Sequence, residues 1–248
     1  MRYFIEIKYK GTRYKGWQKQ KNTHGCIQEI LENALFSVLK VKVNINGCGR
    51  TDAGVHASQF FAHFDIDTYI SSDFITNINY TLPEDIAILK IVNVEANSHA
   101  RFDAESRTYV YLAHFYKDPF LSDLSAYYCY HVKTLDIEEM KNLATKMIGT
   151  HDFFSFCKTP ERHESTVCTV QKFSLEVTDN QMRFAITANR FLKSMVRILV
   201  YELFEVGLKN KTANDVFALL TQKRTLQISK IAHPQGLYLD KVEYKFLV

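Results

Sequence analysis

The chain reads GRTDAGVHA from Gly49 to Ala57, directly after an apolar alternation at Val41, Val43 and Ile45. Glycine tolerates backbone angles that other residues resist. The pattern therefore predicts a strand followed by a tight turn that holds Asp52. An aspartate in such a turn either closes it by bonding to its own backbone or serves chemistry, because rigidly supported loops commonly carry catalytic groups. These nine residues by themselves leave both interpretations open.

The composition is typical of a folded chain. Of 248 residues, 46% are hydrophobic and 23% are charged, which argues against disorder and suffices for one large or two modest domains. The net charge of +4 indicates an acidic partner only weakly. No apolar stretch reaches membrane-spanning length, and the start, Met1–Glu6, lacks the long apolar core of a signal peptide.

The cysteines and histidines favour neither a disulfide framework nor a metal site. The five cysteines form no C-x-x-C pair, and the nine histidines form no H-E-x-x-H motif. A P-loop and a dinucleotide fingerprint are also absent from the sequence. We therefore expect reduced thiols in a cytoplasmic setting, and the absence of these motifs agrees with a reaction that uses no metal and no cofactor.

Strands and helices follow one another without the strict βαβ order of a doubly wound sheet. In the first half, periodicity predicts a strand over 3–9, a helix over 27–40, a strand near 60–66, a short helix after Ser72 and a strand over 86–94. In the second half we predict a strand over 108–116, a helix over 136–149 that stops at Gly149, a hairpin of 173–177 with 182–188, a helix over 191–206, a helix after Thr212 with a near capping box at Asp215, and a closing strand over 237–246.

This order predicts an α+β fold. Two related α/β halves are expected to meet near residues 100–106 and to share a mostly antiparallel sheet, because no Pro-, Gly- or Ser-rich linker separates them. The predicted subdomains are residues 1–104, which carry the Asp52 turn, and residues 105–248.

A basic segment precedes the Asp52 turn. Residues 8–21 hold six cations and no acid, with Tyr9, Tyr14 and Trp17 between them. Such a segment is either a solvated loop or an RNA contact in which cations meet phosphates and aromatic rings stack on bases. Our candidate RNA-binding residues are Lys10, Arg13, Lys15, Trp17, Lys19 and, further along the chain, Lys193.

Two further patterns lie in the second half. In Arg107-Thr108-Tyr109-Val110-Tyr111, the two tyrosines share one face of the predicted strand, where they are either half-buried structural residues or part of a site. In the helix predicted over 191–206, Lys193, Arg197 and Tyr201 are spaced by four, away from the apolar stripe. By spacing alone, Arg197 is equally well a surface arginine.

Together these blocks resemble the tRNA pseudouridine synthase A (TruA) family. The segment from Gly49 to Ala57 agrees with its catalytic signature at all nine positions, and the resemblance implies that Asp52 is the catalytic nucleophile. The Y-x-Y block implies that Tyr109 stacks on an extruded uracil and assists proton movement. The F-x-x-x-M-V-R pattern implies that Arg197 is the cationic partner of the aspartate, for which arginine's planar fork is well suited. We assign Arg50 to a phosphate or to the flipped nucleotide.

The resemblance further implies isomerisation of uridine to pseudouridine at positions 38, 39 and 40 of the tRNA anticodon stem-loop. It implies a homodimer in which RRM- or ferredoxin-like halves flank a central catalytic cleft. A single carboxylate suits a reaction without net hydrolysis, because glycoside hydrolysis normally needs a pair. Two rivals remain: a non-catalytic RNA-binding protein with the same fold, and an aspartate-dependent nucleoside hydrolase.

Two positions and one stretch depart from the family pattern. Tyr201 stands where glycine is usual, Cys168 stands where arginine is usual, and residues 224–233 lack the usual Ala-Gly pair. Tyr201 either fills core space or reshapes the wall of the pocket. These departures bear on which tRNAs and which nucleotides are chosen.

Overall fold

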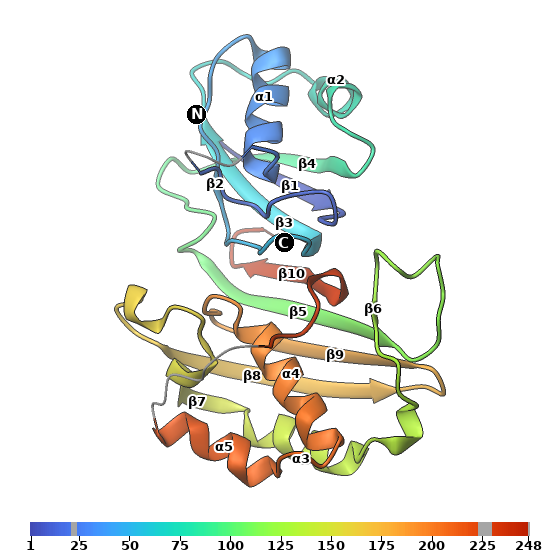
Figure 1. The fold of residues 1–248 in the computed structure, drawn as a ribbon. Coiled ribbons are helices and arrows are strands. Elements are labelled where there is room, and N and C mark those ends of the chain that lie inside the picture. Colours follow the sequence, from blue (N-terminus) through green and yellow to red (C-terminus); the bar gives the residue numbers. More distant parts are fainter. Residues whose placement is uncertain (21–23, 223–229, 248) are drawn as a thin grey trace. The chain divides into compact units, whose positions relative to one another are not determined.

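A computed structural model describes residues 1–20, 24–222 and 230–247. Lys21, from the predicted basic segment, and most of the departure at residues 224–233 lie outside the described residues. The fold is α+β, as predicted, and the described residues contain five α-helices and mostly antiparallel strands (Figure 1). The chain forms two compact units, Met1–Glu105 with Tyr238–Val248, and Ser106–Leu237. The closing strand thus groups with the first unit, whereas our second subdomain extends to residue 248.

The first unit contains an antiparallel sheet in the order β4-β1-β3. Its strands are β1 (Arg2–Tyr9), β3 (His56–Asp65) and β4 (Ile86–Val94). The short strand β2 (Asn46–Gly47) pairs antiparallel with β3, and β10 (Leu237–Tyr244) pairs parallel with the start of β3. Helices α1 (Ile27–Leu39) and α2 (Phe74–Thr81) lie on one face of this sheet (Figure 1).

Helix α1 confirms the helix predicted over 27–40, whose periodicity reflects a buried apolar stripe. Ile27, Leu31 and Leu35 are fully buried, at the i, i+4, i+8 spacing that points one side of a helix at a core. The helix ends at Leu39 because Lys40 adopts the left-handed conformation with φ of 59°. Strand β1 completes this core with Ile5 and Ile7, which are also fully buried.

The strand predicted before the Asp52 turn is largely wrong. Val43 and Ile45 are buried as the alternation indicated, whereas Val41 is exposed, and only Asn46 and Gly47 form a strand. Side chains of α1 replace a partner strand there. The Gln28 amide donates to the Ile45 carbonyl at 3.2 Å, and Glu32 accepts from the Ile45 amide at 3.4 Å. Because these side chains bond the backbone amide and carbonyl of Ile45, the residue can be buried without a neighbouring β-strand.

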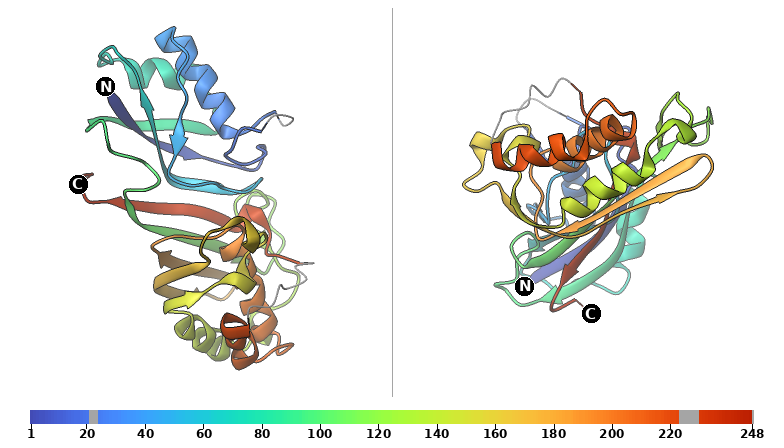
Figure 2. Two further views of the ribbon diagram at one scale, coloured as in Figure 1. Left: turned by 90° about the vertical axis from the view of Figure 1, so that its left-hand side faces the viewer. Right: turned by 90° about the horizontal axis from the view of Figure 1, so that it is seen from below.

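The second unit contains an antiparallel sheet in the order β5-β9-β8-β7. Its strands are β5 (Ala104–His114), β7 (Gly149–Asp152), β8 (Val167–Val177) and β9 (Gln181–Ala188), and the short β6 (Ala126–Tyr127) pairs parallel with β5. The predicted hairpin is β8–β9. Helices α3 (Ile137–Lys146), α4 (Met195–Gly207) and α5 (Ala213–Gln222) lie together on one face of this sheet (Figures 1 and 2). Single 3₁₀ turns are η1 (Val132–Thr134), η2 (Phe154–Phe156), η3 (Pro160–Arg162) and η4 (Pro234–Gly236).

The ends of these helices correct two predicted boundaries. Helix α4 begins at Met195 and not near 191, because Ser194 has φ of 59° and interrupts a helical backbone. Helix α3 ends at Lys146, and Gly149 opens β7 with φ of 119° instead of capping the helix. The capping box of α5 is confirmed: the Thr212 amide donates to the Asp215 carboxylate at 3.0 Å, and the Asp215 amide donates to the Thr212 hydroxyl at 3.2 Å.

Candidate active site

Asp52 lies in the tight turn between β2 and β3. The Val55 amide donates to the Asp52 carbonyl at 3.2 Å and closes the turn, and Gly54 has φ of 78°, which favours glycine. The Asp52 side chain is half-buried. The turn that the sequence predicted is therefore present, and the backbone closes it.

The loop around Tyr14 and Trp17 is hydrogen-bonded to this turn. The Trp17 amide donates to the Thr51 carbonyl at 3.1 Å, and the Gly54 amide donates to the Tyr14 carbonyl at 3.3 Å. Gly16 has φ of 91°, and a Cβ atom there would lie 2.6 Å from the Thr51 carbonyl oxygen. Only glycine permits this approach. Asp52 is consequently held by backbone contacts on both sides.

Trp17 corrects part of the predicted RNA-binding set. Its side chain is 1% exposed, and its ring stacks on Phe60 with centroids 3.9 Å apart and lies 6.3 Å from Tyr9. Tyr9 and Tyr14 are buried as well. No face of the indole is open to a nucleobase, so Trp17 supports the Asp52 turn from the core.

Acids from elsewhere in the chain meet two of the predicted RNA-binding cations. Arg13 forms an ion pair with Asp85 at 2.8 Å, and Lys19 forms one with Glu32 at 3.2 Å. Residues 8–21 contain no acidic residue, so the sequence of this segment did not predict either ion pair. Lys15 is exposed.

Lys10 is half-buried, and its amide donates to the Asp85 carbonyl at 2.9 Å. Arg50 is exposed, and its Nε donates to the Gln18 side-chain oxygen at 2.9 Å. Arg50 and Asp52 thus stand on the same turn of the first unit, beside the loop that carries Gln18.

The second unit carries the other predicted site residues. Tyr109 on β5 is half-buried, and its ring meets Phe191 edge-on with centroids 4.9 Å apart. Arg197 occupies the first turn of α4 and is half-buried. Its Nε donates to the Ala232 carbonyl at 2.8 Å, and the Ala232 amide donates back to the Arg197 carbonyl at 3.1 Å. Lys193 is exposed just before the helix.

Two tyrosines near Arg197 are not among the predicted site residues. Tyr111 is fully buried, and its hydroxyl lies 3.1 Å from that of Tyr128. Burial raises the pKa of Tyr128 to about 12, while the positive charge of Arg197 acts in the opposite direction. The Y-x-Y pattern pointed to Tyr111, but nothing in the sequence around Tyr128 signals a site.

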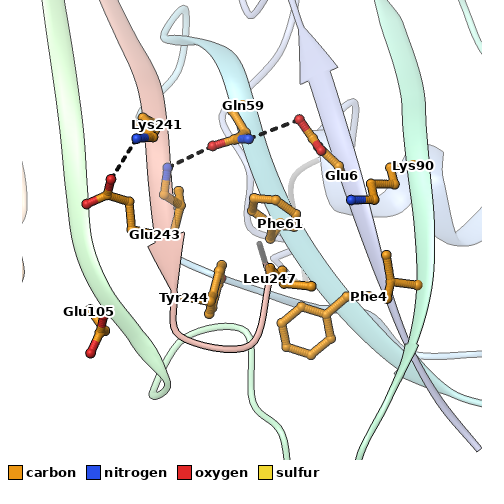
Figure 3. A pocket seen from close by; sticks show the side chains of 12 residues that line it. Phe4, Glu6, Gln59, Phe61, Lys90, Glu105, Lys241, Glu243, Tyr244 and Leu247 are labelled. Atoms are coloured by element: carbon orange, nitrogen blue, oxygen red, sulfur yellow. Dashed lines mark hydrogen bonds and ion pairs between the residues drawn. The ribbon is translucent and has the colours of Figure 1, made fainter.

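A separate hollow of about 520 Å³ lies on the first unit (Figure 3). Gln59 donates to Glu6 at 3.0 Å and accepts from the Val242 amide at 3.0 Å, and Lys241 pairs with Glu243 at 2.6 Å. None of the predicted site residues lines it.

Among the described residues we find no cluster of His, Cys, Asp and Glu with metal-ligand geometry. None of their helices combines the length and apolar character needed to cross a membrane.

Comparison with known proteins decides the family. The sequence profile described as tRNA pseudouridine synthase matches residues 143–245. The tRNA pseudouridine synthase A of Thermoanaerobacter sp. (strain X514) is 38% identical over 242 residues, which cover 97% of this chain and 98% of the relative. The chain belongs to the tRNA pseudouridine synthase A family. The family members of Porphyromonas gingivalis, with 38% identity over 98% of this chain and 97% of the relative, and of Staphylococcus aureus (strain N315), with 37% over 98% and 90%, agree.

Two departures from the tRNA pseudouridine synthase A pattern can be located. Cys168 on β8 is fully buried, and burial raises the pKa of its thiol to about 11. Tyr201 on α4 is half-buried, and burial followed by the nearby Glu205 carboxylate raises the pKa of its hydroxyl. All five cysteines are free thiols, as the sequence indicated. In this family member, Cys168 is therefore an inert packing residue.

Proposed function

We propose that this chain isomerises uridine to pseudouridine in tRNA without a cofactor, and that Asp52 is the catalytic carboxylate. The observation that carries the proposal is the 38% identity to a tRNA pseudouridine synthase A over 97% of the chain. The hydrogen bonds between the Asp52 turn and the loop around Tyr14 and Trp17 support the proposal, because catalytic groups act best when they are held rigidly.

The proposed reaction balances without water or an electron carrier. The N1–C1′ bond of uridine breaks, the uracil turns over, and C5 bonds to C1′. C5 releases its proton, and N1 gains one. Asp52 acts by attack at C1′, by attack at C6, or in a route through a glycal, and all three require the same carboxylate.

We assign three residues to the substrate and the nucleophile. Arg197 is the cationic partner of Asp52, and its planar fork suits a carboxylate. Tyr109 stacks on the displaced base, a role that its half-buried ring allows. Arg50, exposed on the same turn as Asp52, binds phosphate.

The finer proposals rest on the family resemblance. They are modification at positions 38, 39 and 40 of the anticodon stem-loop, a homodimer and a cytoplasmic location. We also propose that the halves are RRM- or ferredoxin-like. In the first unit this is supported by the antiparallel order β4-β1-β3 with β2 paired to β3, and by one helix between β1 and β2 and another between β3 and β4.

One assay distinguishes the three candidate functions. Purified protein is incubated with a tRNA transcript, pseudouridine is mapped chemically, and released uracil is measured. We expect pseudouridine and no free uracil. Binding without product indicates the non-catalytic RNA-binding protein, and free uracil with an abasic tRNA indicates the hydrolase.

Asp52→Asn tests the catalytic residue. We expect this variant to form no pseudouridine while tRNA affinity stays nearly unchanged, because the amide keeps the size of the side chain and loses its charge. Asp67→Asn is the control, since Asp67 is an exposed aspartate of the same unit, and it should retain the wild-type rate. Turnover by Asp52→Asn would remove Asp52 from the proposed role.

A further inference from the structure

A hydrogen-bonded pair of tyrosine hydroxyls lies near Arg197 within the second unit. Tyr111 is fully buried on β5, and its hydroxyl is 3.1 Å from the hydroxyl of Tyr128. Burial raises the pKa of Tyr111 well above its ordinary value, and that of Tyr128 to about 12. Arg197 opposes both shifts, so its positive charge acts on both hydroxyls. At neutral pH both groups are protonated and serve as hydrogen-bonding groups, not as acids or bases.

The same pair is joined to the backbone segment that holds Arg197. Ala232 exchanges two hydrogen bonds with Arg197, one with its backbone and one with its Nε. The next residue, His233, meets the Tyr128 ring edge-on with centroids 6.0 Å apart. At Gly236 a Cβ atom would lie 2.8 Å from the Tyr111 ring. The two tyrosines therefore contact this segment at His233 and Gly236, and Arg197 is bonded to Ala232, which precedes His233.

Tyr128 also contacts the helix that carries Arg197. Its ring lies 4.3 Å from that of Phe204, centroid to centroid. Phe204 follows Arg197 by seven residues, and this spacing puts both on the same face of α4. A change at the tyrosine pair is consequently transmitted to Arg197 by two routes, through Phe204 along the helix and through residues 233–236 to the Ala232 carbonyl.

We propose that the hydrogen-bonded pair Tyr111–Tyr128 is a positioning element that sets the guanidinium of Arg197 for the isomerisation. The inference rests on the proposed function, because it assumes that Arg197 serves the reaction. The pair acts on Arg197 through residues 232–236 and α4, and neither tyrosine touches the base.

The chain offers a matched control in Tyr130. Its ring belongs to the same aromatic cluster, 5.6 Å from Tyr128 and 6.2 Å from Phe204. Its hydroxyl oxygen is also buried, but it has no hydrogen-bond partner among the residues that the structure describes. Tyr130→Phe therefore removes a buried hydroxyl without breaking a bond, whereas Tyr128→Phe breaks the bond to Tyr111.

The experiment measures kcat and KM for pseudouridine formation on a tRNA transcript. We expect Tyr128→Phe to lower kcat roughly five- to ten-fold with KM within about two-fold, because one hydrogen bond that orients a reacting group is lost. Tyr130→Phe should match wild type in both. Tyr111→Phe breaks the same bond from its other end, should repeat the loss, and keeps the test possible if one variant does not fold.

A double-mutant comparison identifies the route. In an Arg197→Lys background, Tyr128→Phe should cause no further loss, because residues that act through one another are not additive. An equal loss in both backgrounds, or equal kcat for Tyr128→Phe and Tyr130→Phe, overturns the inference. Absence of pseudouridine with the wild-type chain instead overturns the proposed function. A wild-type rate for Arg197→Lys removes Arg197 from the reaction and the inference with it, while leaving the isomerase activity established.

Discussion

Substituting Gly16 tests how rigidly the Asp52 turn is held. Gly16→Ala introduces a methyl group at a residue with φ of 91°, and the new Cβ would lie 2.6 Å from the Thr51 carbonyl oxygen. Left-handed backbone angles cost an alanine about 1–2 kcal/mol. Ordinary van der Waals contact begins at 3.4 Å, so the segments around Gly16 and Thr51 must also separate by about 0.8 Å. Overpacking of this kind typically costs a further 1–3 kcal/mol, roughly.

Gly25 provides the matched control. Its φ is 79°, and a Cβ atom there meets nothing within 4 Å. Gly25→Ala consequently carries the backbone cost without the contact. We expect Gly16→Ala to be about 1–3 kcal/mol less stable than Gly25→Ala in urea unfolding.

The two variants should differ in activity as well as in stability. A shift of about 1 Å in a catalytic group can reduce a rate roughly a hundred-fold, so we expect kcat to fall by about that factor in Gly16→Ala and to stay near wild type in Gly25→Ala. Both are measured as pseudouridine formed per minute on the same transcript, below the temperature at which either variant unfolds. Equal stability and equal kcat for the two variants would refute the claim that the Gly16 contact sets the position of Asp52.

Two further predictions concern pH and salt. Burial, followed by the charges of His99 and Arg2, lowers the pKa of His63 to about 4; between that value and about 6.5 the unfolded chain binds a proton that the folded chain does not, so stability should fall by at most about 3 kcal/mol as pH drops through this window. Urea unfolding from pH 7 to 4 should show this loss in wild type and not in His63→Asn, and parallel curves would contradict it. Lys15→Ala should weaken tRNA binding and reduce the slope of log affinity against log salt by about one, whereas Lys19→Ala should change it less because Lys19 is paired with Glu32; identical slopes for both variants and wild type would mean that this loop does not face RNA.

The sequence predicted the features whose cause is local. The stripe of α1, the β8–β9 hairpin and the capping box at Thr212 each depend on residues a few positions apart. The turn that carries Asp52 belongs to this group, since its glycine and its closing hydrogen bond lie within three residues. Family membership also followed from short motifs, because the signature from Gly49 to Ala57 is specific.

The sequence predicted poorly where a distant partner decides the outcome. Trp17 has the neighbours of an RNA-stacking residue, but Phe60, far along the chain, covers its ring. Val43 and Ile45 alternate like a strand, but side chains of α1 satisfy the backbone at Ile45. In each case the local pattern correctly predicted that the side chain packs against a partner. It did not predict which residues that partner would be, because they lie elsewhere in the sequence.

By itself, the sequence determined the α+β class, the helix stripes, the Asp52 turn and the family, because these depend on periodicity and on motifs read along the chain. Tertiary structure alone decided that Arg13 and Lys19 are neutralised by Asp85 and Glu32, that Trp17 is core, and that Tyr111 and Tyr128 share a hydrogen bond near Arg197. The physical reason is that electrostatic and packing energies depend on distance in space, and residues far apart in a sequence carry no local mark of which of them will meet.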